Sequence, residues 1–350
     1  MGPNFLKNIE GGEIIKDRGG RLRNMLAIFL LVVVCGGFFI QKYSLADKSS
    51  LKIKTFIEPF SQVEDFINNY GGYVQVQPPV QVVIKFPELI AEELYNPDKL
   101  TANSVLVKDQ ETGLVLYGKN EYQSWPIASI TKLMSALIIL EKNPDWSATT
   151  TVIGQDSLDT HMYAGDIYTL EELWNSALIA SSNKAILTLA NALGWPELAF
   201  VERMNEKARE LGLINTFFAD PSGLDSANIS MASDVAILLN EALKQEKIQE
   251  TLKKVEYNLY SEQRKKTHHM WNTNWLLLNW INHNFNEISG GKTGYINASG
   301  YNFTMRVANE VGNILDVVIL GATNHEARFT EARDIARWCF DNYVWPVKEN

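Results

Sequence analysis

The sequence predicts an α+β fold, in which an antiparallel sheet is flanked by helices and carries an inserted helical subdomain. Two short apolar strands come first, at 104–108 and 114–117, and a turn over 109–113 joins them as a hairpin. Helical patterns fill the middle of the chain, and two more strands return at 301–307 and 314–320. Because strands come from both ends of this region, we expect one sheet, a helical lobe and a ligand cleft between them.

The predicted helices have recognisable ends. An almost wholly apolar helix begins at Ser129 and ends before Asn143, and such a helix is expected to lie buried in the middle of a domain. Thr169 and Glu172 form a capping box that opens the next helix. Further helices are predicted to begin at Asn183, Pro196 and Ser233, and a last one runs from about Glu326 to Tyr343.

Composition excludes several classes of function. The 350 residues are 46% apolar and include nine Trp, which is typical of a globular protein with a large core. The net charge is −9 and no long basic stripe occurs, so nucleic acid is not an expected partner. The two cysteines, Cys35 and Cys339, cannot build a disulfide framework. The five histidines are scattered without an H-E-x-x-H motif, so we expect no metal site and no cofactor.

The N-terminal part of the chain predicts export. Residues 25–41 are uncharged and mostly apolar, and four basic residues lie just before them at 16–23, so residues 1–24 should stay inside as a cytoplasmic tail. We favour a single-pass transmembrane anchor over a signal peptide cut after Ala46, because the lead before the apolar run is long for a signal peptide. In both cases residues 42–100, a juxtamembrane spacer, and the domain at 101–346 lie outside the cytoplasm. The domain is held at the cell membrane by an anchor, or secreted after cleavage.

Ser129 and Lys132 are the first pair that predicts chemistry, because residues three apart on a helix share one face. A serine hydroxyl is a weak nucleophile until a base takes its proton. Lys132 can be that base only if its pKa falls well below about 10.4. Burial in the apolar helix is one expected cause, and the charge of a nearby Lys292 is another. S-x-x-K also occurs at Ser49–Lys52 and Ser181–Lys184, so the apolar helix is what distinguishes Ser129.

Two further motifs follow in order. Ser181-Ser182-Asn183 lies between two predicted helices, where it serves either as a catalytic hydroxyl and amide or as a helix N-cap. Its S-x-N spacing recurs at 226–228. Lys292-Thr293-Gly294 occurs once, after Ser289-Gly290-Gly291, and is either a backbone that a ligand approaches closely or a glycine-rich turn with a solvated lysine. Together the three motifs predict acyl transfer without a catalytic histidine.

The ordered motifs resemble those of the penicillin-binding D-alanyl-D-alanine carboxypeptidases, the low-molecular-mass serine DD-peptidases. The resemblance covers about residues 101–345, and the matching segments are 126–134, 178–183, 204–213, 220–224, 272–274, 291–295 and 321–323. It implies a penicillin-binding/β-lactamase-like fold. It also implies a serine peptidase of the cell wall that removes the terminal D-Ala from peptidoglycan stem peptides and is inhibited by β-lactams.

The resemblance implies a role for each matching residue. Ser129 is the nucleophile that the penultimate D-Ala acylates, and Lys132 is its general base. Ser181 passes a proton to the departing D-Ala, and Asn183 holds Lys132 and the substrate amide. The other expected substrate contacts come from one segment: Lys292 and Thr293 bind the terminal carboxylate, Gly294 keeps the backbone close, and the N–H groups of Tyr295 and Ser129 form the oxyanion hole.

Other functions stay open at this point. The same residues serve a D,D-endopeptidase or a β-lactamase-like hydrolase, although no E-x-x-x-N segment typical of class A lactamases occurs between the motifs. A non-catalytic wall-binding module is the third hypothesis, and the intact motifs argue against it. Among the remaining polar residues, Arg328 is either an additional carboxylate-binding residue or a residue on a helix surface, and we favour the surface position. His268-His269 is expected as an exposed loop pair.

Overall fold

The computed structural model describes residues 85–346. The predicted tail, the segment 25–41 and most of the predicted spacer lie outside the described residues. Within residues 85–346 no helix has both the length and the apolar character needed to cross a bilayer. The described end of the spacer contacts the domain, because β1 (Glu88–Leu89) pairs antiparallel with β13 (Tyr343–Val344). The domain boundary at residue 101 stays a prediction.

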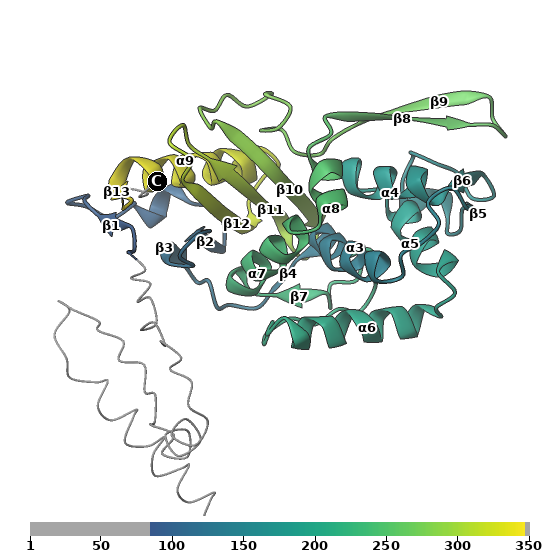
Figure 1. Cartoon of the computed structure of the whole chain (residues 1–350), viewed down its shortest axis with the longest axis horizontal. Helices are drawn as coiled ribbons and strands as arrows, with labels where there is room; N and C mark the ends of the chain where they lie inside the picture. Colours follow the sequence, from purple (N-terminus) through teal and green to yellow (C-terminus); the bar gives the residue numbers. More distant parts are fainter. Residues whose placement is uncertain (1–84, 347–350) are drawn as a thin grey trace, which may run out of the picture. The chain divides into compact units, whose positions relative to one another are not determined.

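Five antiparallel strands form the main sheet, in the order β10-β11-β12-β2-β3 (Figure 1). The predicted N-terminal hairpin supplies β2 (Ser104–Asp109) and β3 (Val115–Lys119). The C-terminal part supplies β10 (Glu287–Ile296), β11 (Gly300–Ala308) and β12 (Ile314–Ala322). Strand β12 pairs with β2, so the two ends of the domain join in one sheet, as predicted. Strand β10 is left as an edge strand.

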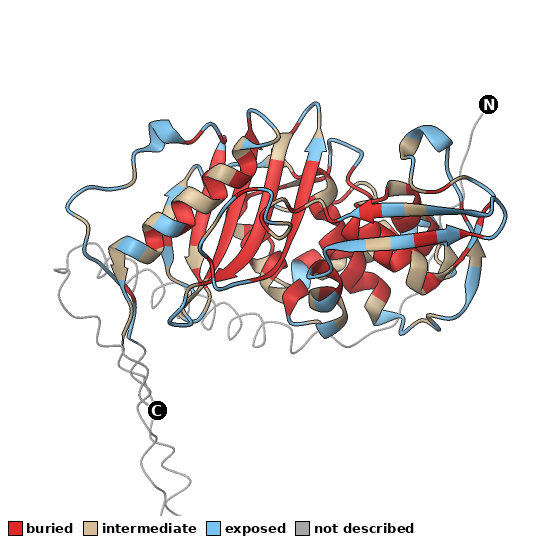
Figure 2. Ribbon diagram, turned by 90° about the horizontal axis from the view of Figure 1, so that it is seen from above, coloured by how far each residue is buried: buried red, intermediate tan, exposed pale blue. Residues whose placement is uncertain are grey.

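The sheet separates two hydrophobic cores, because successive side chains of a strand point to opposite faces. Val105 and Val107 of β2 pack with the inner side of helix α9 (Ala327–Asn342), whereas Leu106 between them packs with the helical lobe. Strand β12 alternates in the same way. Figure 2 shows the central strands buried along most of their length, with helices covering both faces.

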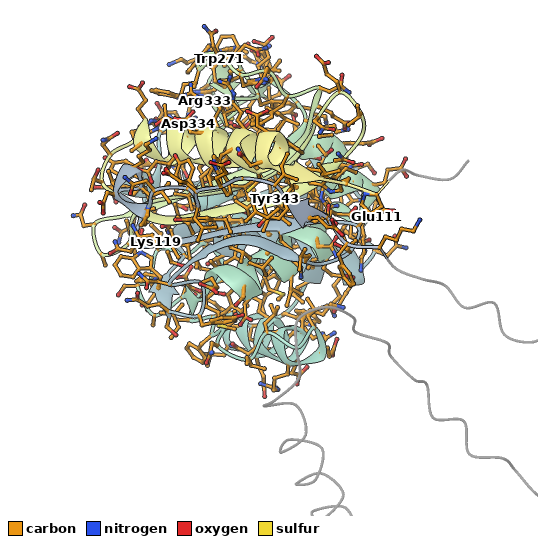
Figure 3. The ribbon with its side chains drawn as sticks, turned by 90° about the vertical axis from the view of Figure 1, so that its left-hand side faces the viewer. Glu111, Lys119, Trp271, Arg333, Asp334 and Tyr343 are labelled. Atoms are coloured by element: carbon orange, nitrogen blue, oxygen red, sulfur yellow. The ribbon has the colours of Figure 1, made fainter. Side chains whose placement is uncertain are left out.

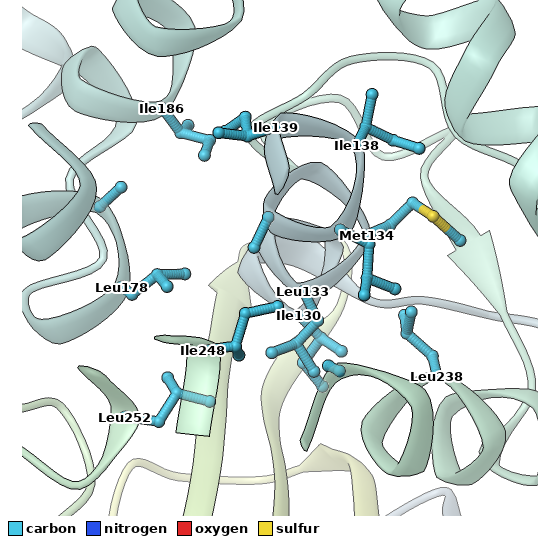
Figure 4. Packing of buried hydrophobic residues seen from close by; sticks show 14 of the residues in the cluster. Ile130, Leu133, Met134, Ile138, Ile139, Leu178, Ile186, Leu238, Ile248 and Leu252 are labelled. Atoms are coloured by element: carbon cyan, nitrogen blue, oxygen red, sulfur yellow. The ribbon is translucent and has the colours of Figure 1, made fainter. Parts of the chain in front are cut away.

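A nearly all-apolar helix lies at the centre of the helical lobe. A 3-10 turn, η2 (Ala128–Thr131), leads into α3 (Lys132–Glu141), whose residues 132–139 are all buried. Figure 4 shows its isoleucine, leucine and methionine side chains packed against those of the surrounding helices. The surrounding helices are α4 (Leu170–Ile179), α5 (Asn183–Ala192), α6 (Glu197–Glu210), α7 (Ala232–Leu243) and α8 (Glu246–Leu252).

Short two-stranded pairings and turns complete the domain. The strand pairs are β4 (Trp125–Pro126) with β7 (Ile229–Ser230), β5 (Thr149–Thr151) with β6 (Ile167–Thr169), and β8 (Glu256–Ser261) with β9 (Lys266–Trp271). Two more 3-10 turns are η1 (Pro97–Lys99) and η3 (Asp156–Leu158). In Figure 1 the β8–β9 hairpin extends along the upper side of the helical lobe.

The predicted α+β fold is therefore confirmed. The capping box is present, because Thr169 Oγ1 accepts from the Glu172 N–H at 3.1 Å while the Glu172 carboxylate accepts from the Thr169 N–H at 2.8 Å. Residues 289–294 are not a glycine-rich turn but part of β10. His268 and His269 lie on β9 rather than in a loop. Cys339 is buried on α9, and Cys35 lies outside the described residues.

Candidate active site

The three motifs meet at one cavity of about 660 Å³ between the sheet edge and the helical lobe. Ser129 comes from the turn before α3, Ser181 from the junction of α4 and α5, and Thr293 and Gly294 from the edge strand β10. Each of these residues lines the cavity. Chain segments more than a hundred residues apart therefore contribute to a single site, as the predicted cleft requires.

Lys132 is held in one position against Ser129. Its Nζ lies 2.8 Å from Ser129 Oγ, 2.7 Å from Asn183 Oδ1 and 2.7 Å from the Ser222 carbonyl oxygen. The Asn183 amide also donates to the Leu158 carbonyl at 3.4 Å, which orients its oxygen towards Lys132. The Asn183 Oδ1 and the Ser222 carbonyl oxygen can only accept hydrogen bonds, so each takes one N–H group of the Lys132 amine. The remaining position of Nζ faces the serine hydroxyl.

A tight turn presents the Ser222 carbonyl to Lys132. The carboxylate of Asp220 accepts from the N–H and hydroxyl of Ser222 at 2.5 and 2.6 Å and from the Gly223 N–H at 2.8 Å. Gly223 has φ +84°, and a Cβ there would lie 2.0 Å from the Ala128 carbonyl oxygen. Only glycine fits this conformation and this contact. The segment 220–224, which matches the family motif, therefore supports Lys132 structurally by holding the Ser222 carbonyl in place.

Burial sets the proton affinity of the base. Lys132 is fully buried, and this desolvation lowers its pKa from 10.5 to about 7, against the opposing charges of Asp220 and Asp159. Burial, and not the predicted charge of Lys292, accounts for the lowered pKa of Lys132. Burial lowers the pKa of Lys292 well below its usual value, and the charges of Lys132 and Arg328 lower it further.

Lys292 supports the second motif. Its Nζ donates to Ser181 Oγ at 2.7 Å and to the Thr293 carbonyl at 3.1 Å, and the side chain is 1% exposed. The predicted alternative of a solvated lysine is wrong. Ser181 has φ +61° and Ala128 has φ +50°, which are costly for residues with side chains. Both strained residues lie in the site, next to or within its motifs.

The strand that carries the third motif packs directly on the nucleophile turn. A Cβ on Gly294 would lie 2.5 Å from the Ile127 carbonyl oxygen and 3.2 Å from the Ser129 nitrogen. The absence of a side chain therefore lets β10 approach the backbone of Ser129. Tyr295 follows, half exposed, with its ring stacked on Tyr301 at 4.4 Å between centroids. All eight predicted site residues are thus part of one constellation.

Arg328 is a site residue that was predicted on a helix surface, and that prediction is wrong. Its side chain is 4% exposed and lines the cavity. One guanidinium nitrogen lies 2.7 Å from His325 Nε2, but Nε has no hydrogen-bond partner in the described part of the chain. Burial lowers the pKa of Arg328 to about 10. The pKa of His325 is lowered to about 4, mainly by burial and to a smaller extent by the positive charge of Arg328. Helical periodicity predicts that Phe329 faces the core, but it does not show that other parts of the chain bury the neighbouring Arg328.

Two other residues support the site without having been predicted to do so. Thr273 lies in a matched segment but had no predicted role, and Asp159 had no signal in the sequence. Thr273 Oγ1 accepts from Thr293 Oγ1 at 2.7 Å, within the matched segment 272–274. Asp159 accepts from Ser182 Oγ and from the Lys184 N–H, both at 2.9 Å, and so holds the start of α5. Ser182 itself is the N-cap of that helix, since its Oγ accepts from the Ala185 N–H at 3.1 Å. Nothing in the local sequence marks Asp159 as a partner of this motif.

The described residues contain no group of three or more His, Cys, Asp or Glu arranged to hold a metal ion. The chemistry available at the cavity is that of a serine with a buried amine base. A second hydroxyl lies against a second amine, and a buried guanidinium has a free donor. This donor set fits attack on a carbonyl group in a ligand that carries a carboxylate.

Comparison with known proteins shows the family of this chain. A family model described as D-alanyl-D-alanine carboxypeptidase, peptidase family S11, matches residues 91–324. The chain is 32% identical over 245 residues to a D-alanyl-D-alanine endopeptidase of Pseudomonas aeruginosa, over 69% of this chain and 77% of that protein. It is also 32% identical over 254 residues to the D-alanyl-D-alanine carboxypeptidase DacF of Bacillus subtilis, over 69% of this chain and 63% of that protein.

Solved structures show the same fold. A D-alanyl-D-alanine carboxypeptidase from Mycobacterium tuberculosis matches with a TM-score of 0.64 and 26% identity, covering 74% of this chain and 97% of that one. Penicillin-binding protein D2 from Listeria monocytogenes, solved in an ampicillin-bound form, matches with a TM-score of 0.59 and 25% identity, over 71% of this chain and 100% of that one. The predicted fold and enzyme class are confirmed: the chain belongs to the D-alanyl-D-alanine carboxypeptidase family of serine peptidases.

Proposed function

We propose that this protein is a membrane-tethered D-alanyl-D-alanine carboxypeptidase that trims peptidoglycan stem peptides through an acyl-enzyme on Ser129. The observation that carries the proposal is the position of Lys132. Its amine is buried, fixed by two acceptor oxygens and 2.8 Å from the serine hydroxyl. A neutral lysine in that position is a general base without a histidine.

The first half of the reaction follows from these contacts. Lys132 Nζ takes the proton of Ser129 as Oγ attacks the carbonyl of the penultimate D-Ala. The N–H groups of Ser129 and Tyr295 stabilise the negative oxygen, and losing one such donor typically costs about 2.7–4 kcal/mol. The close approach of Gly294 to the Ser129 nitrogen brings the two segments together.

The second half of the reaction uses the other two motifs. Ser181, held by Lys292, passes a proton to the nitrogen of the departing D-Ala. Asn183 binds the substrate amide. The terminal carboxylate binds Thr293 and Lys292, and Arg328 adds a guanidinium with a free Nε to this carboxylate site. Water then hydrolyses the ester and restores Ser129.

The same site should react with β-lactams, because they offer a strained carbonyl beside a carboxylate. The structural relative from Listeria monocytogenes was solved in an ampicillin-bound form. For this chain we infer acylation of Ser129 by penicillins and slow release of the product.

The location is part of the proposal. Residues 25–41, with basic residues before them, are proposed to anchor the domain on the outer side of the cytoplasmic membrane. Cleavage after Ala46 is the alternative. N-terminal sequencing of the protein from membranes distinguishes them: an intact N-terminus supports the anchor, and a new terminus at residue 47 refutes it.

Release of D-Ala from a synthetic stem pentapeptide ending in D-Ala-D-Ala tests the activity. The full-length protein should release one D-Ala per peptide, and Ser129→Ala should abolish it. Ser181→Ala should slow it strongly, whereas substitution of the exposed Ser226 of the second S-x-N segment by Ala should have no effect. Equal activity of the Ser129→Ala variant would refute the proposal.

A D,D-endopeptidase activity is a second candidate, because relatives of both names match this chain. The same nucleophile and base serve both reactions, and only the leaving group differs. The structure around the leaving group is therefore the place where the two activities can be separated.

A further inference from the structure

Arg328 is a buried cation that has no carboxylate partner in the described chain. Its side chain is 4% exposed, and its hydrogen-bond partners among residues 85–346 are a backbone carbonyl and a histidine. Arg306 shows the common alternative, since this buried guanidinium contacts both carboxylate oxygens of Asp316 at 2.7 and 2.8 Å. An unpaired buried charge is costly, and no acidic residue of the described chain lines the cavity beside Arg328. The carboxylate that completes this site is therefore expected from a ligand.

Neutral groups hold the guanidinium of Arg328 from two sides. One terminal nitrogen donates to the Gly294 carbonyl oxygen at 3.4 Å, and the other donates to His325 Nε2 at 2.7 Å. Gly294 belongs to β10, whereas Arg328 lies in the first turn of α9, the yellow helix that Figure 3 shows packed across the sheet. Arg328 Nε has no partner in the described part of the chain. This nitrogen and the second hydrogens of the two terminal nitrogens therefore stay available to a ligand.

The contact with Arg328 fixes the protonation state of His325. Arginine can only donate hydrogen bonds, so His325 Nε2 must accept, the ring proton lies on Nδ1 and the imidazole is neutral. Burial and the Arg328 charge favour the same state, because they lower the pKa of His325 to about 4. A neutral acceptor orients the guanidinium without cancelling its charge. A carboxylate in the same place would pair with Arg328 and compete with the carboxylate of a ligand.

Packing and backbone contacts hold His325 in place. The centroid of its ring lies 4.2 Å from that of Trp275 and 5.6 Å from that of Phe329. The side chain of Asn324 accepts from the N–H groups of residues 326 and 327 at 3.1 and 2.8 Å, which ties the backbone on both sides of His325 together. The imidazole is therefore a preformed support, and the geometry of the guanidinium does not have to be assembled when a ligand binds.

We propose that His325 is a positioning residue for the reaction: as a neutral acceptor it holds the Arg328 guanidinium in the orientation that binds the terminal carboxylate of the substrate. This inference rests on the proposed function, because the carboxylate is that of the departing D-Ala. His325 acts through Arg328 and not on the scissile bond. Its loss should therefore weaken the discrimination between a charged and a neutral peptide end.

Two peptides measure this discrimination: a synthetic stem pentapeptide that ends in D-Ala-D-Ala with a free carboxylate, and the same peptide with a terminal carboxamide. Their binding to the full-length Ser129→Ala protein, which cannot turn them over, is measured by isothermal titration calorimetry. The ratio of the Kd for the amide to the Kd for the acid is the carboxylate preference. We expect the Ser129→Ala parent to prefer the acid.

Two variants of His325 in this parent separate its hydrogen bond from its volume. His325→Leu removes the acceptor and should lower the carboxylate preference at least about tenfold, in line with the loss of a hydrogen bond to a charged group. His325→Gln keeps an acceptor atom and should lower the preference less than about threefold. The control His268→Leu changes a half-buried histidine of β9 outside the cavity lining, and should leave the preference unchanged. Thermal melting of each variant checks that it is folded.

Coupling to Arg328 gives an independent test. In protein that carries Arg328→Gln the carboxylate preference should already be low, and adding His325→Leu should lower it by less than about twofold, because the two residues act as a unit. A further loss of about tenfold would show that His325 acts on the carboxylate without Arg328, and would overturn the positioning role.

The outcomes separate this inference from the proposed function. If His325 only fills space, His325→Leu weakens binding of the acid and the amide equally, and the unchanged preference overturns the inference. A loss in His325→Gln as large as that in His325→Leu overturns it too, since the acceptor then has no role. In both cases release of D-Ala by the wild type leaves the carboxypeptidase function standing. If neither peptide binds and penicillin does not acylate Ser129 of the wild type, the proposed function itself fails.

Discussion

The pH dependence of acylation is the property that this structure predicts most sharply. Full burial lowers the pKa of Lys132 from 10.5 to about 7, and only the neutral amine can take the Ser129 proton. A base with pKa 7 is about 91% neutral at pH 8 and about 9% neutral at pH 6. The rate constant for acylation should therefore fall about tenfold between pH 8 and pH 6 and be nearly flat above pH 8.

An unburied lysine would behave differently. With a pKa of 10.5 the neutral fraction of the lysine rises roughly tenfold per pH unit. It is therefore about a hundredfold lower at pH 6 than at pH 8, and it continues to rise up to pH 10. Stopped-flow measurement with a fluorescent β-lactam that does not titrate between pH 6 and pH 10 separates the two curves. A straight tenfold rise per unit, without a plateau, would refute the idea that burial tunes this base.

Substitution of Asp159 tests the direction in which a nearby negative charge shifts the pKa of Lys132. The negative charge of Asp159 raises the pKa of Lys132 against the effect of burial. Replacing Asp159 by Asn keeps a polar group of the same shape but removes the charge. The midpoint of the pH profile should move to lower pH. A shift to higher pH contradicts the assignment of the titrating group to Lys132.

The remaining predictions concern the supports of the site and the sheet. In Gly294→Ala the new Cβ meets backbone atoms at the nucleophile turn, so we expect penicillin acylation of Ser129 to slow about a hundredfold, and an unchanged rate would contradict this packing. Asp220→Ala removes an acceptor of several hydrogen bonds, and urea denaturation should show a loss of about 3 kcal/mol; a loss below about 1 kcal/mol would be inconsistent with its role. Asp316→Ala leaves Arg306 buried without the carboxylate that it contacts at 2.7 and 2.8 Å, so we expect a loss of about 3–5 kcal/mol in the same assay, and a neutral effect would show that water replaces the pair.

Local rules predicted much of this fold. The capping box at Thr169 needs only a side chain and a backbone three residues away, and the structure confirms it. The pairing of Ser129 with Lys132 is equally local. The helix was predicted to begin at Ser129, whereas Ser129 lies in the 3-10 turn before α3, but residues three apart also share one face in a 3-10 turn. The two strands at each end and the central helix are apolar runs bounded by turn residues, and each has its predicted type.

Long-range packing explains what the sequence could not show. The glycine-flanked Lys292 is compatible with a turn or an edge strand, and only the pairing of β10 with β11 decides between them. Arg328 is polar on a helix, yet its side chain is buried where α9 meets the cavity. The grouping of Trp271 with Trp280 depends on how the chain folds back after β9, which no periodicity records.

Penicillin labelling of the full-length protein tests most directly the claim that Ser129 is the nucleophile activated by Lys132. Intact mass spectrometry should show one covalent adduct per chain, and peptide mapping should place it on Ser129. Ser129→Ala should show no adduct, and Lys132→Met should acylate at least about a hundredfold more slowly, in line with the loss of a general base. An adduct that persists in Ser129→Ala, or that maps to another serine, would contradict the mechanism.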